Sequence, residues 1–273
     1  MSVNSLDTSP RRAASTTTAR DDRAAVDKAM ALLASFELDE LDEGLGVSEL
    51  ARRSGLSKST AFRILGLLER NGAVERIGSA YRLGHQMHNI GAQVYPTEHL
   101  RIRDLLTPFL ADLYIATGQT VHLAVLRGSD VLYLNKLYGH RHLPSPSRIG
   151  GRAPAHCTAV GKALLAHVDA FRPEDVDLEI RTKNSVSDSS SLGRQLTEVR
   201  RTGIAFDREE VLLGLNCVGA VVSGGLGKPV AAMSVSGSAS SLDLSAHTHI
   251  LRRVCSAASR AMSAQRVGRP EAV

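Results

Sequence analysis

The sequence predicts an α+β protein of two domains, the first mainly helical and the second built on a mainly antiparallel sheet. Three observations indicate this. The chain has 273 residues, enough for two domains of ordinary size. Up to about residue 117, most apolar residues recur at the three-to-four-residue spacing of helices. After residue 117, segments with the two-residue alternation of strands are interspersed with further helical segments. This order is typical of an α+β arrangement.

Composition narrows the class of protein. Hydrophobic residues make up 43% of the chain and tryptophan is absent, which indicates an aliphatic core. The formal charge of +5 suits a polyanionic partner without requiring one. The cysteines, Cys157, Cys217 and Cys255, are too few and too widely spaced for a disulfide framework, which favours a reducing, cytoplasmic location. No stretch has the length of a membrane span or the pattern of a signal peptide, so we expect no membrane contact.

The N-terminal region begins with a tail and a first helix. Residues 1–20 are rich in Ser, Thr, Ala and Arg without apolar periodicity, which predicts a disordered tail. Residues 24–36 then show the apolar spacing of an amphipathic helix.

Two further short helices meet at Ser54-Gly55-Leu56, where the glycine supplies the positive φ that a tight turn needs. Residues 74–77 and 81–83 flank Gly78-Ser79-Ala80 and predict a small hairpin. Two helices, a tight turn and a hairpin in this order are typical of a winged helix-turn-helix, which we assign to residues 21–84.

The second helix of this motif has the features of a helix that reads the DNA major groove. Ser57 is placed to cap it, and Ala61, Ile64, Leu65 and Leu68 form its apolar side. Its other side begins with short hydroxyls and long cations, which contact base edges and phosphates in such helices. The predicted DNA-binding residues are Ser57, Lys58, Ser59, Thr60 and Arg63 on the helix, with Arg76 and Arg82 on the wing. An ordinary helical domain could share the amphipathic helices and the glycine turn, but the combination within residues 47–84 favours DNA binding.

The elements of the second domain follow a linker helix at residues 85–97. The predicted helices lie at residues 98–117, 158–168, 188–202 and 243–265. The predicted strands lie at residues 120–126, 131–137, 204–206, 218–223 and 230–236, and a loop rich in Gly, Pro, Ser and Arg at 139–154. The domain is assigned to residues 98–266, with a tail at 267–273. Gly224-Gly225-Leu226-Gly227 is predicted to be a hairpin turn, because no strand–loop–helix context surrounds it as in a phosphate loop.

Six segments then occur in one order along the chain: LARRSGLSKSTAFRIL, TGQTVHLAVLRGSDVLYL, HCTAVGKALLA, GIAFDREE, GLNCVGAVV and AAMSVSG. Together they resemble the IclR family of bacterial transcription regulators, from about Ala24 to Ala264. HCTAVGKALLA and the pairing of Glu209-Glu210 with Cys217 are specific, whereas many families share the helix-turn-helix. The resemblance implies a C-terminal effector-binding domain of GAF-like architecture. It also implies homodimers or dimers of dimers, bound to palindromic operators in double-stranded DNA.

The resemblance also implies where a small-molecule effector binds. In IclR-like proteins the HCTAVGKALLA helix begins at a small carboxylate, which places the contacting amides at Ala159 and Val160. The other matching effector positions are Asp207, Cys217, Ser234 and Ser236. From the residues alone, free amides at a helix start form an anion site, and two serines two residues apart share one face of a strand. The alternatives are a loop-to-helix junction without a ligand and an ordinary half-polar strand.

Two positions depart from the family pattern beside this predicted site. Gly219 stands where family members commonly carry Ala, and Asn216 stands where a basic residue is frequent. Both departures bear on which effector is bound.

We therefore expect a ligand-responsive, DNA-binding transcriptional regulator, activator or repressor, whose effector is a small carboxylate or aromatic acid. One alternative is a small-molecule sensor whose winged helix contacts proteins. Another is an enzyme that uses Cys217 near Glu209 and Glu210, or Cys157 next to His156. Since buried free cysteine usually acts as a small hydrophobe, no catalytic residue is predicted.

Histidines raise the question of a metal site. His122, His140, His142 and His156 lack the compact spacing of a metal-ligand set, so neither a metal nor a cofactor is predicted.

Overall fold

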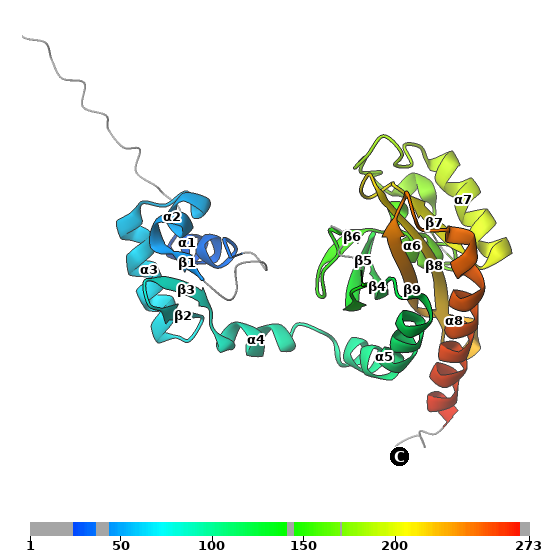
Figure 1. The fold of residues 1–273 in the computed structure, drawn as a ribbon, viewed down its shortest axis with the longest axis horizontal. Coiled ribbons are helices and arrows are strands. Elements are labelled where there is room, and N and C mark those ends of the chain that lie inside the picture. The colour runs from blue at the N-terminus through cyan, green and yellow to red at the C-terminus, as the bar shows by residue number, and fades with distance from the viewer. Residues whose placement is uncertain (1–23, 37–43, 141–144, 170, 268–273) are drawn as a thin grey trace, which may run out of the picture. The chain divides into compact units, whose positions relative to one another are not determined.

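The computed structural model describes residues 24–36, 44–140, 145–169 and 171–267. The chain divides into two compact units, residues 1–94 and 95–273, which are described separately below (Figure 1). The predicted tail at residues 1–20 lies outside the described residues. The last helix runs to Val267, the first residue of the predicted C-terminal tail.

The first unit is the winged helix-turn-helix that the sequence predicts. Its elements are α1 (Ala25–Leu33), β1 (Leu45–Gly46), α2 (Val47–Ser54), α3 (Lys58–Arg70), β2 (Val74–Ile77), β3 (Ala80–Leu83) and α4 (His85–Ala92). The strands form an antiparallel sheet in the order β1-β3-β2. Gly55 ends α2 with a φ of 65°, so the chain turns into α3 as the glycine predicts. Leu32, Leu50, Leu65 and Tyr81, from three helices and the hairpin, are buried in one small core.

The second unit is an α+β domain around one antiparallel sheet. Its helices are α5 (Thr97–Thr117), α6 (Ala159–Leu165), α7 (Ser189–Thr202) and α8 (Leu244–Val267). Its strands are β4 (Thr120–Arg127), β5 (Asp130–Leu137), β6 (Arg152–Pro154), β7 (Ala205–Arg208), β8 (Leu215–Ser223) and β9 (Pro229–Ser238). They lie in the order β6-β5-β4-β9-β8-β7 with every neighbouring pair antiparallel. The short strand β6 falls inside the segment that the sequence predicts as loop.

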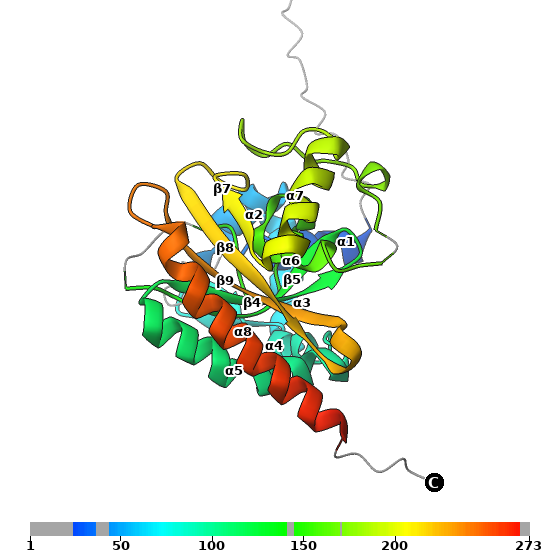
Figure 2. The ribbon, with the colours of Figure 1, turned by 90° about the vertical axis from the view of Figure 1, so that its right-hand side faces the viewer.

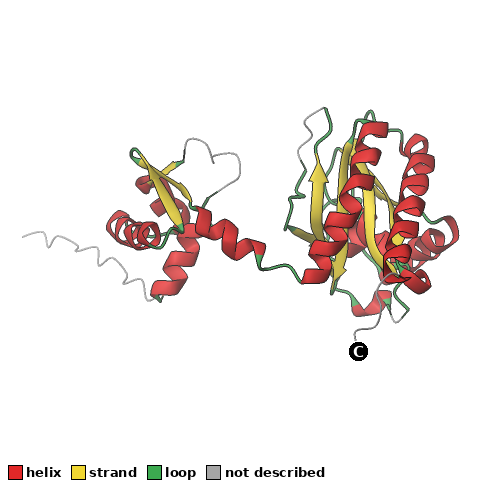
Figure 3. Ribbon diagram, turned by 90° about the horizontal axis from the view of Figure 1, so that it is seen from below, coloured by secondary structure: helices red, strands yellow, loops and turns green. Residues whose placement is uncertain are grey.

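The sheet separates two hydrophobic cores. Helices α5 and α8 cover one face, and α6 and α7 cover the other (Figures 2 and 3). Leu110 of α5 and Leu251 of α8 belong to the first core, whereas Leu164 of α6 and Leu192 of α7 belong to the second. Because successive strand residues face opposite sides, each central strand contributes side chains to both layers.

A register irregularity in the β4–β5 pair decides which β5 side chains face α6. Lys136 pairs with His122 and Asn135 with Leu123, but Ala124 then pairs with Tyr133, so Leu134 is skipped. Leu134 packs in the core beneath α5, and the Asn135 amide donates a hydrogen bond to Thr107 of that helix at 2.9 Å. Lys136 and Tyr133, three residues apart, therefore lie on the same face of the sheet.

Candidate functional site

Two rows of mostly polar residues cross neighbouring strands on the face of the sheet that carries α6. The first row, from β4 to β7, is Thr120, Ser236, Cys217 and Asp207. The second row, from β5 to β8, is Lys136, His122, Ser234 and Gly219. The polar side chains in both rows are buried. Because burying a polar group without a partner is costly, such a concentration under a helix marks a candidate binding site.

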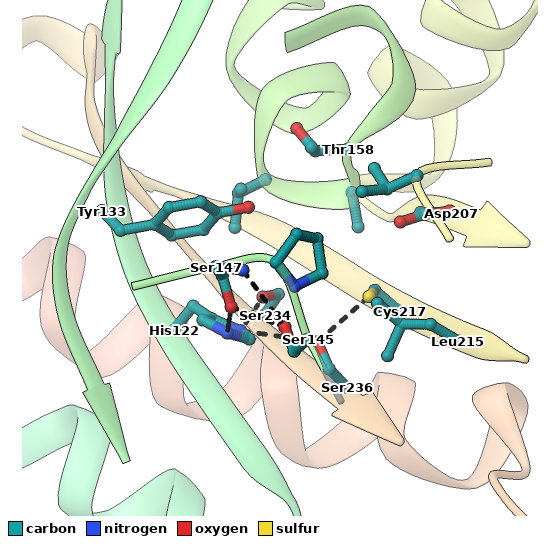
Figure 4. A pocket seen from close by; sticks show the side chains of 14 residues that line it. His122, Tyr133, Ser145, Ser147, Thr158, Asp207, Leu215, Cys217, Ser234 and Ser236 are labelled. Atoms are coloured by element: carbon teal, nitrogen blue, oxygen red, sulfur yellow. Dashed lines mark hydrogen bonds between the residues drawn. The ribbon is translucent and has the colours of Figure 1, made fainter. Parts of the chain in front are cut away.

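These rows meet the start of α6 at one cavity of about 20 Å³ (Figure 4). Its lining includes Ala159, Val160, Asp207, Cys217, Ser234 and Ser236, so the structure brings together all six residues predicted to contact an effector. His122, Tyr133, Thr158, Val211, Leu215 and the segment Ser145–Ser147 complete the lining. A cavity of this size holds about one water molecule.

The start of α6 presents unpaired backbone donors to the cavity. Thr158 caps the helix by accepting a hydrogen bond from the Gly161 amide at 3.0 Å. Ala159 and Val160 are the first two helical residues, whose amides have no acceptor within the helix. Both residues line the cavity.

Glycine at position 219 lets α6 begin directly on β8. A Cβ added to Gly219 would lie 2.7 Å from the carbonyl carbon and oxygen of Ala159 and 3.0 Å from the Val160 nitrogen. This departure from the family pattern therefore has a structural role at the site. The other departure, Asn216, has no such role. Because Asn216 and Cys217 are consecutive on β8, their side chains face opposite sides of the sheet, and Asn216 is not among the cavity residues. The expectation that Asn216 lies beside the site is therefore wrong.

The carboxyl and thiol groups of the cavity are biased toward their neutral forms. Burial raises the pKa of Asp207 to about 6, although the Glu210 amide, which donates to Oδ1 at 2.8 Å, opposes the shift. Burial, with a smaller contribution from Asp207, also raises the pKa of Cys217 well above its usual range. The Ser236 hydroxyl donates to the Cys217 sulfur at 3.0 Å. An activated nucleophile needs a lowered thiol pKa, so this environment argues against an enzyme that uses Cys217.

A buried ion pair supports the segment that carries Asp207. The Lys162 ammonium on α6 donates to Glu210 and, at 2.8 Å, to Gln195 of α7. Ser185 fixes the same segment by donating its hydroxyl to the Glu210 carbonyl at 2.7 Å. Breaking a buried pair of this kind by removing one partner costs about 3–5 kcal/mol. We infer that the pair holds the backbone amide of Glu210 against Asp207.

His122 is one of the cavity residues that the sequence did not predict as an effector contact. Its Nε2 lies 2.7 Å from the Ser147 hydroxyl, and its Nδ1 lies 3.3 Å and 3.4 Å from the hydroxyls of Ser234 and Ser236. Burial lowers the pKa of His122 to about 3, so the ring is neutral at pH 7. The alternation of residues 120–126 was the available signal, because it places a polar ring on a buried strand face.

Of the histidines considered as metal ligands, His122 and His156 form hydrogen bonds within the domain. His156 bonds the Glu179 carbonyl through Nε2 at 3.1 Å, and His142 lies outside the described residues. Across the residues that the structure describes, no three His, Cys, Asp or Glu side chains gather as a metal site would require.

In the first unit, the start of α3 presents the predicted DNA contacts. The Thr60 amide donates to the Ser57 hydroxyl at 3.2 Å, so Ser57 caps the helix as predicted. Lys58, Ser59 and Arg63 are exposed and Thr60 is half-buried. Within residues 24–36 and 44–94, no carboxylate pairs with Lys58 or Arg63, which leaves both cations available to phosphates.

The wing cations are exposed but engaged within the hairpin. Arg82 forms an ion pair with Glu75 at 2.9 Å, and Arg76 donates to the Gly78 carbonyl at 3.0 Å. Phe62, 55% exposed beside Arg63, is an aromatic side chain on α3 that sequence reasoning did not single out. Apolar side chains in the major groove contact thymine methyl groups, so Phe62 joins the candidate contacts.

Both units match family models. The model described as the IclR helix-turn-helix domain matches residues 25–78, and the model described as the bacterial transcriptional regulator IclR C-terminal region matches residues 95–264. The chain belongs to the IclR family. It is therefore a transcriptional regulator with a DNA-binding helix-turn-helix domain and a C-terminal effector-binding domain.

Individual relatives agree over most of the chain. The HTH-type transcriptional regulator Rv1719 of Mycobacterium tuberculosis is 33% identical over 186 residues, which cover 66% of this chain and 70% of the relative. The crystal structure of the Thermotoga maritima IclR protein superposes with a TM-score of 0.72 at 29% identity, covering 87% and 98% of the two chains. An IclR homologue from Microbacterium hydrocarbonoxydans, crystallised with 4-hydroxybenzoate, shares the fold with a TM-score of 0.70 at 24% identity, covering 88% and 99%. No helix among the described residues is long and apolar enough to span a membrane.

Proposed function

We propose that this IclR-family regulator binds a palindromic operator as a homodimer or dimer of dimers, and that an organic acid bound in the cavity at α6 changes that binding. The observation that carries the proposal is the meeting of Ala159, Val160, Asp207, Cys217, Ser234 and Ser236 in one cavity. With DNA as its partner, the protein would act in the cytoplasm, where bacterial DNA lies.

On the DNA side, α3 enters the major groove with its N-terminal end first. Lys58 and Arg63 contact phosphates or guanine edges, Ser59 and Thr60 contact base edges, and Ser57 holds the helix start. Arg76 and Arg82 of the wing approach the neighbouring backbone. A dimer places two such helices one or more turns of the duplex apart, which calls for a palindromic site.

On the effector side, the cavity offers donors to a carboxylate. The amides of Ala159 and Val160 are oriented by the helix start, and the hydroxyl of Ser236 and the thiol of Cys217 can donate from the sheet, while the Ser234 hydroxyl contacts the His122 ring. Asp207 is neutral below its raised pKa of about 6 and then donates as well. The 4-hydroxybenzoate bound by the Microbacterium homologue supports the acid class.

The effect on DNA binding follows if the acid favours one of two conformational populations, since a ligand shifts an equilibrium only through differential affinity. A thermal-shift screen of small carboxylates and aromatic acids against the full chain tests the effector half, because a ligand of the native state raises the melting temperature.

Electrophoretic shifts with the chain's own upstream DNA, at several salt concentrations, test the other half. Log affinity that falls steeply with log salt supports phosphate contacts. Binding that is absent or independent of salt supports the alternative in which the winged helix contacts proteins.

A further inference from the structure

Strand β5 holds a buried ammonium that has no acidic partner among the described residues. It does not line the cavity itself, but it adjoins two residues that do, Ser147 and His122. Lys136 is 6% exposed, and no carboxylate of the described residues lies within ion-pair distance of its Nζ. Its contacts are the Ser147 carbonyl oxygen at 2.8 Å and the Tyr138 ring, whose centroid is 4.6 Å away. A buried charge needs a counter-charge or a full set of hydrogen bonds, so this cation is only partly compensated.

His122 places a second donor beside Lys136. The two residues are cross-strand partners in the β4–β5 pair and face the same side of the sheet. The Ser234 hydroxyl can donate to His122 Nδ1, which leaves the proton of the neutral ring on Nε2. Nε2 then donates to the Ser147 hydroxyl at 2.7 Å.

Ser147 therefore satisfies two adjacent donors with two oxygens, its hydroxyl on His122 and its carbonyl on Lys136. Two oxygens facing an ammonium and a neighbouring N–H are what a carboxylate supplies, with the advantage of a full negative charge. Ser147, which lines the cavity beside His122 (Figure 4), thus occupies the place of an anion.

The cavity is too small for an effector, so part of its lining must move before one binds. A space of about 20 Å³ has room for one water and for no organic acid. Most of the lining belongs to strands and to α6, which are packed into the two cores. Ser145, Pro146 and Ser147 line it from a loop, with Pro146 exposed and the two serines half-buried. This loop segment contributes no residue to either core, so it can leave the lining without disrupting a core.

We propose that the effector is a dicarboxylic acid whose second carboxylate replaces Ser147 on Lys136 and His122. The first carboxylate lies at Ala159 and Val160, so this inference rests on the acid effector proposed above and adds a second anion subsite to it. A monocarboxylic acid that displaces Ser147 leaves the Lys136 ammonium without its carbonyl partner, which makes it the weaker ligand.

The test compares matched acids by isothermal titration calorimetry of the full chain. The pairs are butanoate and succinate, pentanoate and glutarate, hexanoate and adipate, and benzoate and terephthalate. At least one diacid is expected to bind about tenfold or more tightly than its monoacid, the worth of one charge-assisted hydrogen bond. Lys136→Met is expected to bring that ratio close to one, whereas Lys136→Arg retains a preference.

Two further variants complete the design. Lys183→Met removes an equal charge at an exposed position outside the cavity lining and should leave the ratio unchanged. Ser147→Ala removes a competing oxygen and keeps both donors, so diacid affinity should rise.

Equal affinity for mono- and diacids in the unmodified chain, or a diacid preference that survives Lys136→Met, overturns the inference and leaves the acid-effector proposal standing. If no acid of any pair binds, the acid-effector proposal fails and this inference fails with it. Should Lys136→Met not fold, Ser147→Ala decides, because unchanged or weaker diacid binding in that variant contradicts the displacement of Ser147.

Discussion

Replacing Gly219 by Ala tests whether the close contact between β8 and the start of α6 shapes the effector site. The added Cβ would lie 2.7 Å from the carbonyl carbon and oxygen of Ala159, whereas ordinary contact begins near 3.4 Å, so the helix start must move by about 0.7 Å. The obstructing atoms are backbone, which cannot rotate away. Overpacking of this kind costs about 1–3 kcal/mol, or roughly 2–12 °C in melting temperature for a domain of this size.

The same displacement should weaken the effector. A shift of about 0.7 Å lengthens hydrogen bonds from the Ala159 and Val160 amides beyond good geometry, and losing one such bond corresponds to roughly tenfold in affinity.

Thermal unfolding of the full chain and calorimetric titration with the acid found by screening measure both effects. Gly193→Ala on α7 is the matched control, because its Cβ would meet only a Pro173 side-chain atom at 3.8 Å and alanine favours the helix. If Gly219→Ala matched the unmodified protein in stability and in affinity, the close contact between β8 and α6 would not shape the effector site.

Substitutions at three further positions test other features of the molecule. Asp207→Asn should remove a pH-dependent loss of stability. Burial raises the pKa of Asp207 in the folded state from 3.8 to about 6. The free energy of unfolding is therefore highest below about pH 4 and falls as pH rises through 6, by roughly 3 kcal/mol at most. Urea unfolding at pH 4.5 and 7.5 measures this, and an equal fall in the variant contradicts it. Ser57→Ala should cost the helix-turn-helix unit about 1 kcal/mol by removing its cap, and Ser57→Gly only a few tenths; equal stability of all three proteins in thermal unfolding argues against the cap. Arg63→Ala should lower DNA affinity and reduce the slope of log affinity against log salt by about one, with Lys183→Ala as control; an unchanged slope excludes a phosphate contact.

Much of the fold could be predicted because its core residues recur at regular spacing along the sequence. Within the helix predicted at residues 98–117, Ile102, Leu106, Leu110 and Leu113 recur at helical spacing and are all buried in α5. The two-residue spacing of Ser234 and Ser236 predicted that they share one face of a strand, and both line the cavity from β9. The cap at Ser57 and the turn at Gly55 depend on local backbone chemistry, which the sequence carries directly.

The arrangement of Lys136, His122 and Ser147 beside the cavity could not be predicted in the same way. Strict alternation from Lys136 would put Leu134 on the sheet face that carries α6, but the β4–β5 irregularity puts Tyr133 there, where it lines the cavity. Ser147 reaches His122 from a loop 25 residues later in the chain, a contact that no periodicity indicates. The register of the wing strands places Glu75 directly opposite Arg82. Arg82, which is predicted to contact DNA, therefore forms an ion pair within the hairpin.

The central claim, that α3 reads DNA under control of the cavity at α6, is tested most directly by fluorescence anisotropy. The full chain is titrated into labelled duplex from its own upstream region and into an unrelated duplex of equal length, with and without the acid that raises its melting temperature. We expect a preference for the upstream duplex of about a thousandfold or more at physiological salt, and a dissociation constant that changes with the acid. The double variant Lys58→Ala, Arg63→Ala should lose the preference. Equal affinity for both duplexes would contradict DNA reading by α3, and upstream binding that is the same with saturating acid and without it would contradict control by the cavity.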